Sequence, residues 1–271
     1  MNSYVTLVAN ADYLLGARAL ARSLAMCRSR WPLTVLATEN MAGLDELEAM
    51  GCSVQIVDPL PVSDGFRAAH CRSAQHSQAP FTKGTKPQFH DPLQNFVKLR
   101  LWELEQYENV VFLDADALVV QNIDRLFDFP EFSAAPNLYE SLTDFQRMNS
   151  GVFTAKPSRR TFDAMLAHLD RPNVFWKRTD QTFLQSFFPD WDGLPYIYNT
   201  LQYVWFNMPQ LWNWQRIRVI HYQYEKPWEA NHPKRSLLAP LIDLWWQVLD
   251  QGRLPGTLID PQAVDLRAVA S

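Results

Sequence analysis

The chain has 271 residues, a length that fits one large domain or two small ones at roughly 150 residues per domain. Its 25 basic and 29 acidic side chains give a formal net charge of −4, which disfavours a general binder of the nucleic-acid backbone. The hydrophobic content of 47% excludes a disordered chain.

Strand-like and helix-like segments alternate over the first half of the chain. This alternation predicts an α/β fold with a mostly parallel central sheet. The apolar run at residues 110–113 predicts a strand covered on both faces, in the middle of that sheet. The predicted strands are residues 4–9, 33–38, 53–57 and 109–113, and the predicted helices are residues 13–26, 44–50 and 96–105.

Residues 59–92 interrupt this pattern with Pro, Ser, Gln, His and Lys. Such a connection is far longer than the ~4–6 residues usual in compact domains, so we expect a functional or disordered loop. Regular elements then resume. The predicted strands of the second half are residues 148–155 and 216–222, its predicted helices are residues 158–169, 179–188 and 237–249, and residues 252–271 form a tail.

Cysteine usage and the N-terminal sequence bear on the compartment. Cys27, Cys52 and Cys71 are an odd number of cysteines at wide spacing, which favours a reducing compartment over a disulfide framework. No signal-peptide pattern is readable, and the longest apolar stretches fall short of the ~20 residues that span a bilayer. We therefore expect a soluble, cytoplasmic protein.

The most informative motif is Asp114-Ala115-Asp116, directly after the apolar run. Side chains of an extended chain alternate in direction, so both carboxylates point the same way at the end of a buried strand, where open α/β sheets bind ligands. Without a cation the two carboxylates would repel each other. The motif therefore indicates a shared cation, although a strand end running into a solvated turn is a simpler alternative.

A second candidate is His221, at the end of a short apolar strand. A neutral imidazole beside Asp114 and Asp116 would make a mixed nitrogen and oxygen site that suits Mn²⁺, with Mg²⁺ as the alternative. Lys226 follows five residues later and could meet a phosphate if the chain folds back. Taken singly, His221 could equally be a core histidine and Lys226 a surface lysine.

These residues belong to a series of short motifs that follow one another along the chain. They are Thr6, Leu7, Asn10, Tyr13, Gly16, residues 98–102 (Lys-Leu-Arg-Leu-Trp), 114–116 (Asp-Ala-Asp), 122–127, 133–136, 149–153 (Asn-Ser-Gly-Val-Phe), 180–181 (Asp-Gln), 198–199 (Tyr-Asn), His221 and 226–228 (Lys-Pro-Trp). In this order they resemble glycosyltransferase family 8, the retaining glycosyltransferases related to glycogenin and galactinol synthase.

The resemblance implies a fold, a reaction and partners. It implies one Rossmann-like GT-A domain over residues 1–235, with residues 236–271 as a C-terminal helix and tail packed on or beside it. It also implies metal-dependent, retaining transfer of a hexose, glucose or galactose, from a UDP-sugar to an acceptor hydroxyl. The acceptor stays open among a polyol such as inositol, a lipid headgroup and a glycan. Membrane association and a homodimer stay open too, and no nucleic acid is expected.

The resemblance also assigns roles to single residues. The metal ligands would be Asp114, Asp116 and His221. The donor would contact Asn10 and Tyr13 at the uracil, Ala115 at the ribose, Lys98 and Lys226 at the phosphates, and Asn149, Ser150 and Gly151 at the sugar. Asp180 and Gln181 would steady the cationic sugar while the acceptor hydroxyl attacks the same face and the leaving phosphate takes its proton.

Two departures from the family pattern stand out. Counting from Tyr198-Asn199 places Phe206 where glycogenin has its self-glucosylated tyrosine, and phenylalanine offers no hydroxyl. The glycine usual between the metal histidine and Lys-Pro-Trp is absent, the spacing is one residue shorter, and Glu225 precedes Lys226. These changes put the exact phosphate contact of Lys226 in doubt and leave Glu225 without an assigned role.

Two other functions compete with the transferase. A haloacid dehalogenase-type phosphatase would use Asp114 as nucleophile and Asp116 as acid/base, but that motif closes the first strand of its fold and here several strands precede it. A non-catalytic sugar-nucleotide binder would not need the complete set of metal ligands. For the transferase, we expect residues 59–92, with Arg67, Lys83 and Lys86, to close over the donor and exclude water.

Overall fold

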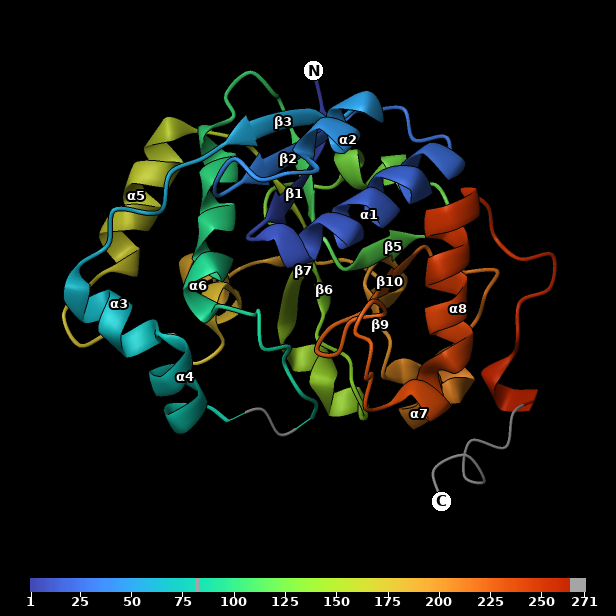
Figure 1. Cartoon of the computed structure of the whole chain (residues 1–271). Helices are drawn as coiled ribbons and strands as arrows, with labels where there is room; N and C mark the ends of the chain where they lie inside the picture. The colour runs from blue at the N-terminus through green and yellow to red at the C-terminus, as the bar shows by residue number, and fades with distance from the viewer. Residues whose placement is uncertain (81–82, 264–271) are drawn as a thin grey trace.

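A seven-stranded sheet forms the centre of the computed structural model, which describes residues 1–80 and 83–263. The strand order is β3-β2-β1-β4-β7-β6-β8 (Figure 1). The first four are parallel, whereas β7 runs antiparallel to β4 and β6. This architecture confirms the mostly parallel sheet. The bounds are Ser3–Val8 (β1), Leu33–Ala37 (β2), Ser53–Ile56 (β3), Val110–Leu113 (β4), Ser133–Pro136 (β6), Met148–Ala155 (β7) and Asp192–Gly193 (β8).

A second sheet of three strands lies between the large sheet and the C-terminal helix α8 (Figure 1). Its order is β5-β10-β9, with bounds Ala117–Val119, Val219–His221 and Thr200–Leu201. Strand β5 pairs antiparallel with β10, and the register sets His221 opposite Ala117. This pairing brings the end of β10 to the turn that carries the two aspartates.

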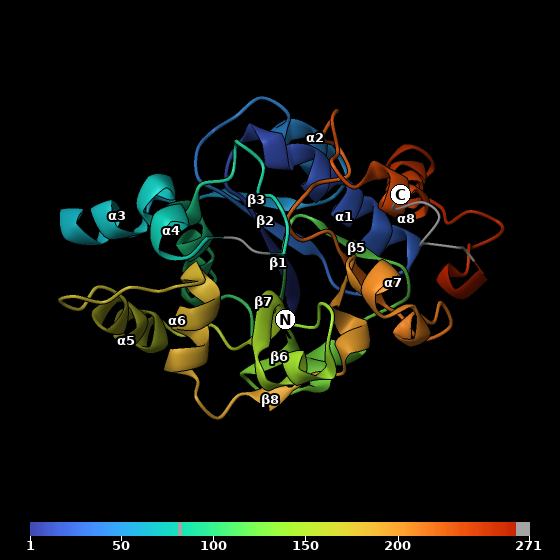
Figure 2. The ribbon, with the colours of Figure 1, turned by 90° about the horizontal axis from the view of Figure 1, so that it is seen from below.

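Helices cover both faces of the large sheet (Figure 2). Helices α1 (Leu14–Met26) and α2 (Leu44–Ala49) lie on one face. The 3-10 helix η2 (Pro92–Glu103) and helices α5 (Arg159–Leu169) and α6 (Thr179–Phe187) lie on the other. Alternate residues of β4 belong to the two hydrophobic clusters, so the apolar run is buried on both sides as predicted.

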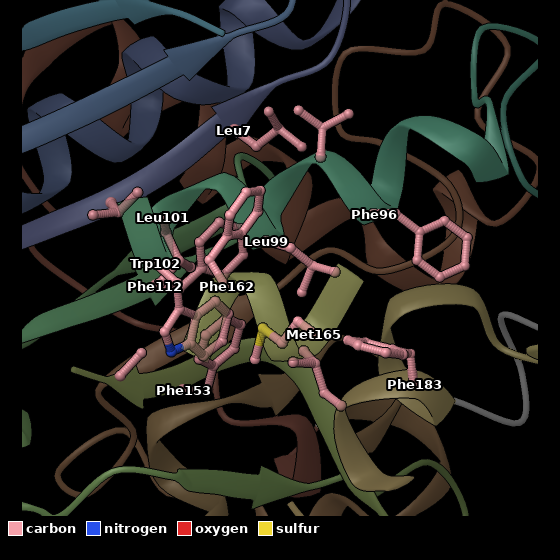
Figure 3. Packing of buried hydrophobic residues seen from close by; sticks show 14 of the residues in the cluster. Leu7, Phe96, Leu99, Leu101, Trp102, Phe112, Phe153, Phe162, Met165 and Phe183 are labelled. Carbon is pink, nitrogen blue, oxygen red and sulfur yellow. The ribbon is translucent and has the colours of Figure 1, made fainter. Parts of the chain in front are cut away.

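Aromatic side chains fill the cluster beneath η2 (Figure 3). The ring of Phe153 stacks on Trp102 with centroids 5.8 Å apart and on Phe112 with centroids 5.0 Å apart. These contacts fix η2 against β4 and β7. As a result, Lys98 on η2 is held with its Nζ 4.6 Å from the centroid of the Phe112 ring, beside the carboxyl end of β4.

The described residues of the segment 59–92 are more ordered than the sequence predicts. It contains helices α3 (Asp64–His70) and α4 (Arg72–Gln78), and Ser63 caps the first of them by accepting a hydrogen bond from the Phe66 backbone N–H. The Phe66 ring is buried and meets Phe96 of η2 at a centroid distance of 5.3 Å. Each helix has only two turns, too short for a periodic apolar face, and contacts with distant segments stabilise both.

His70, at the end of α3, joins this segment to the chain before α6. Its Nε2 accepts a hydrogen bond from the Trp176 backbone N–H (2.9 Å), and its Nδ1 lies 3.0 Å from the Phe66 carbonyl, to which it donates as the neutral tautomer. Burial lowers the pKa of His70, outweighing the Phe66 carbonyl and the Asp170 carboxylate, which raise it.

Because the folded state binds a proton at His70 less readily than the unfolded chain, stability should fall as the pH drops through ~6.5, the unfolded histidine pKa. We expect the melting temperature of His70→Gln, which keeps a donor and an acceptor but does not titrate, to change less between pH 7.5 and 5.5 than that of the wild type. Thermal melts across this range measure the slope of melting temperature against pH. Parallel slopes for the two proteins would contradict the assignment.

The C-terminal helix α8 (Arg235–Gln251) packs on α1 and shares a hydrophobic cluster with α7 (Val204–Asn207). Trp245 is fully buried, and Trp246 donates from Nε1 to the Pro227 carbonyl (3.1 Å). Both tryptophans therefore serve packing on the core. In the described parts of the chain, every helix is either too short or too polar to cross a bilayer.

Candidate active site

A cavity of about 550 Å³ opens at the carboxyl ends of β1 and β4. Strand order reverses between these strands, and such a switch point is where open α/β sheets bind ligands. Ten of the sequence-predicted site residues line the cavity. They are Tyr13, Lys98, Asp114, Ala115, Asp116, Ser150, Asp180, Gln181, His221 and Lys226.

Asp114, Asp116 and His221 converge on one point of the cavity wall. One ligand atom from each lies within 4.8 Å of the others. His221 Nε2 is 3.2 Å from Asp116 Oδ1 and 3.7 Å from Asp114 Oδ2. The aspartates do not stand on an extended strand as the sequence argument assumed, because Ala117 donates its backbone N–H to the Asp114 carbonyl and closes a turn. They meet because the pairing of β5 with β10 places His221 beside that turn.

Asn199, Asn149 and Gly151 hold the His221 ring in its orientation. Nδ1 lies 2.9 Å from Asn199 Oδ1, and Asn199 Nδ2 donates to Asn149 Oδ1 (2.8 Å). With Nδ1 as the donor, the Nε2 lone pair faces the two carboxylates, as a metal-binding histidine requires. A Cβ on Gly151 would lie 2.2 Å from His221 Cε1. Asn149 and Gly151 thus support the ring from behind and do not line the cavity.

Lys98 lies at the centre of a buried polar network. Its Nζ is 2.9 Å from Asp114 Oδ1 and 2.8 Å from Asp180 Oδ2. Ser150 Oγ donates to the same Asp180 oxygen (2.6 Å). Burial disfavours the ammonium, but Asp114 and Asp180 outweigh burial and raise the pKa of Lys98. The network joins η2, the turn after β4, β7 and the start of α6 in one fixed arrangement.

Lys226 is almost completely buried and contacts the other carboxylate, Asp116 Oδ2. Its Nζ also donates to the Tyr222 carbonyl (3.1 Å). Burial opposes ionisation of Asp116, but Lys226 and then His221 hold the pKa of that carboxyl well below its usual range. Asp116 is therefore an anion at neutral pH, and the Lys226 ammonium lies at the cavity wall next to it.

Asn10, which the resemblance places at the uracil of the donor, also lies outside the cavity lining. Its side chain accepts from the Asp12 backbone N–H (3.1 Å) and donates to the Phe89 carbonyl (2.9 Å). Asn10 thus ties the end of β1 to the segment that crosses the cavity mouth. Tyr13, three residues later, does reach the cavity.

Glu225, which the sequence left without a role, fixes that same segment. Its carboxylate is buried and accepts hydrogen bonds from the Thr85 backbone N–H (2.8 Å), Tyr203 Oη (2.5 Å) and Lys234 Nζ (2.7 Å). A Cβ on Gly84 would lie 2.0 Å from Tyr203 Oη, so the backbone approaches at a distance only glycine allows. Glu225, a departure from the family pattern, therefore anchors residues 83–90.

Comparison with known proteins decides the family. The family model described as "Glycosyl transferase family 8" matches residues 4–232, most of the chain. The chain belongs to glycosyltransferase family 8. It is therefore a glycosyltransferase. This assignment excludes the phosphatase and the non-catalytic sugar-nucleotide binder.

The chain is similar to family members whose names describe different activities. The chain is 32% identical to human glycogenin-1, with 93% of this chain and 73% of glycogenin-1 aligned. It is 27% identical to galactinol synthase 4 of Arabidopsis thaliana, covering 93% of this chain and 82% of that protein. It is 29% identical to UDP-glucuronate:xylan alpha-glucuronosyltransferase 1 of the same plant, covering 92% of this chain and only 37% of that protein.

Solved structures support the GT-A fold. The glycosyltransferase GlyE of Streptococcus pneumoniae superposes with a TM-score of 0.62 at 16% identity, over 98% of this chain and 61% of GlyE. The galactosyltransferase LgtC superposes with a TM-score of 0.58 at 13% identity, over 94% of this chain and 98% of LgtC. At these identities the likeness concerns the fold alone.

Proposed function

We propose that this glycosyltransferase moves a hexose from a UDP-sugar to an acceptor hydroxyl with retention of configuration, using a divalent cation. The observation that carries the proposal is the convergence of Asp114, Asp116 and His221 at the switch point of the sheet. Two carboxylates and an imidazole suit Mn²⁺, with Mg²⁺ as the alternative. A cation held there would act as a Lewis acid on the departing diphosphate.

The chain's own residues divide the remaining work. Lys226 lies beside Asp116 and would face the diphosphate, where its ammonium offsets negative charge that grows as the glycosidic bond breaks. Asp180 and Gln181, at the start of α6, line the same cavity and would lie against the sugar. The Lys98 and Ser150 contacts hold Asp180 in place, so its carboxylate is positioned before the substrate arrives.

Slow hydrolysis of the donor without acceptor tests this proposal. Purified protein is incubated with UDP-glucose or UDP-galactose and MnCl₂, and released UDP is measured by chromatography. We expect UDP release that stops on addition of EDTA and returns with excess Mn²⁺. If neither donor binds or releases UDP under any of these conditions, the proposed donor class is wrong.

We predict that the protein does not glycosylate itself. Phe206 on α7 has no hydroxyl, and the adjacent Tyr203 hydroxyl is buried in its hydrogen bond with Glu225 and 3.0 Å from Lys234 Nζ. Intact-protein mass spectrometry after incubation with UDP-glucose and Mn²⁺ should therefore find an unchanged mass. A series of hexose additions that maps by peptide analysis to Tyr203 would contradict this expectation.

We also predict that donor binding protects backbone amides from hydrogen exchange at the cavity mouth. Within the segment 59–92, we expect this protection at residues 83–90. This stretch contains no helix or strand, and side chains from other segments hold it, as when Arg72 Nη1 donates to the Pro87 carbonyl (2.8 Å) and Glu225 accepts from Thr85. Hydrogen exchange there should slow on addition of UDP and Mn²⁺. Helix α3, which packs on η2, serves as an internal control. Equal exchange with and without UDP would make the segment a passive connection.

The location of the protein stays a prediction. The free thiols of Cys27, Cys52 and Cys71 support the cytoplasmic location that we propose. The acceptor that we propose is a polyol such as inositol, a lipid headgroup or a glycan.

A further inference from the structure

The cavity lining carries an excess of positive charge. Among the described residues that line it, seven side chains are basic and four are acidic. They are Lys83, Lys86, Lys98, Arg147, Lys177, Arg178 and Lys226 against Asp91, Asp114, Asp116 and Asp180. The chain as a whole has a net charge of −4, so this concentration of cations is local.

Ion pairs account for only part of the excess. Lys98 and Lys226 pair with the aspartates of the centre. Lys83 pairs with Glu140, and Arg147 pairs with Asp144 at 3.0 Å. In contrast, Lys177 and Arg178 make no ion pair with any residue that the structure describes. A nucleotide-diphosphate sugar together with a divalent cation has no net charge, so the donor would leave these cations unbalanced.

The backbone that carries Lys177 and Arg178 is fixed from three sides. Gln75 of α4 is buried, and its Nε2 donates to the carbonyls of Trp176 (3.2 Å) and Lys177 (2.8 Å). His70 accepts the Trp176 backbone N–H. Asn95 of η2 donates to Thr179 Oγ1 (3.1 Å). Both residues are exposed, but their backbone is fixed, and only Thr179 separates Arg178 from Asp180.

Further groups from other elements face the same part of the cavity. Tyr139, Tyr224 and Lys86 line it together with Arg178. The Lys86 Nζ lies 5.2 Å from the centroid of the Tyr224 ring. Arg178 is close enough to act electrostatically on Tyr139 and Tyr224. Cations from the chain just before α6 and from residues 83–90 therefore line the same space as the two tyrosine rings.

We propose that Lys177 and Arg178, on the same cavity wall as Lys86, bind an anionic group, a phosphate or a carboxylate, carried by the acceptor or by the transferred sugar. This inference rests on the proposed function and adds the class of substrate to it. Arginine offers paired N–H donors that match the oxygens of either group, and lysine adds a point charge. The local positive field also raises the concentration of anionic substrates at the mouth.

Calorimetry with matched probes tests the acceptor as the source. Glucose 6-phosphate and glucose are titrated into the protein with UDP and MnCl₂ present, and again without them. We expect glucose 6-phosphate to bind at least ~10-fold tighter, the factor that one charge-assisted hydrogen bond supplies. Lys177→Gln and Arg178→Gln should each remove about that factor. Arg171→Gln is the control. Arg171 is exposed between α5 and α6, as Lys177 and Arg178 are, and does not line the cavity. Its substitution removes the same charge.

A second arm tests the transferred sugar. UDP-glucuronate and UDP-glucose are compared for binding and for UDP release, with the same three variants. A preference for UDP-glucuronate that Arg178→Gln removes and Arg171→Gln keeps would assign the anion to the donor sugar. No preference for either anionic probe, or equal losses in Arg171→Gln, would overturn the subsite. Failure of the wild type and Arg171→Gln to bind UDP with Mn²⁺ would instead contradict the proposed function, while the titrations without UDP still decide the subsite.

Discussion

Replacing Asp116 with asparagine should lower manganese-dependent turnover at least ~100-fold, because the change removes one of two carboxylates available to the cation and keeps the shape of the side chain. Asparagine is preferable to alanine here. Lys226 is buried against Asp116. Alanine would leave its ammonium only the Tyr222 carbonyl as an acceptor, whereas the asparagine Oδ1 can still accept a hydrogen bond from it. UDP release at several Mn²⁺ concentrations measures both turnover and apparent metal affinity.

The control for this experiment is Asp128→Asn, which removes one exposed carboxylate that is not part of the cavity lining. It should behave as the wild type does. Melting temperatures of both variants report whether the fold is intact. Wild-type turnover and wild-type Mn²⁺ affinity in the folded Asp116→Asn protein would show that Asp116 is not a metal ligand.

A single methyl group at Gly151 should damage the same centre from behind. The added Cβ would lie 2.2 Å from His221 Cε1 and 2.5 Å from His221 Nδ1. Strand β7 is hydrogen-bonded to β4 on one side and to β6 on the other, so its backbone has little room to move. We expect Gly151→Ala to displace the His221 ring, weaken Mn²⁺ binding at least ~10-fold and lower stability by ~1–3 kcal/mol.

Gly193→Ala is the matched control, since Gly193 also lies in a strand of the large sheet and a Cβ there would meet nothing within 4 Å. Calorimetric titration with MnCl₂ and denaturant unfolding measure the two effects. If Gly151→Ala binds Mn²⁺ as tightly as Gly193→Ala and unfolds at the same denaturant concentration, the His221 ring is not held as described.

Local patterns in the sequence predicted the centre of the fold well. The apolar run of β4 and the aspartates that follow it are adjacent in the chain, and burial on both faces leaves a clear signal at these positions. The strands and helices of the first fifty residues fall within a few residues of their predicted bounds for the same reason. The helix expected at 96–105 is instead a 3-10 helix that already begins at Pro92.

Features that depend on distant segments could not be derived in this way. The register of β5 against β10 decides that His221 meets Asp116, and no local pattern encodes it. Family resemblance supplied that pairing. Asn199 was noted only as part of a motif, and its hydrogen bond to His221 Nδ1 became visible in the structure. Helices α3 and α4 were missed because buried contacts such as that of Phe66 with Phe96, rather than their own periodicity, stabilise them.

The place where the two sheets meet has a consequence for folding. Asp116 lies in the short turn between β4 of the large sheet and β5 of the small sheet. His221 ends β10 of the small sheet, and Lys226 follows β10 in the chain, 110 positions away from Asp116 in sequence. Contacts over such separations form only after much of the chain is in place. The polypeptide must therefore be nearly complete before the cation site exists, and a ligand that binds there would stabilise the docking of both sheets as one cooperative unit.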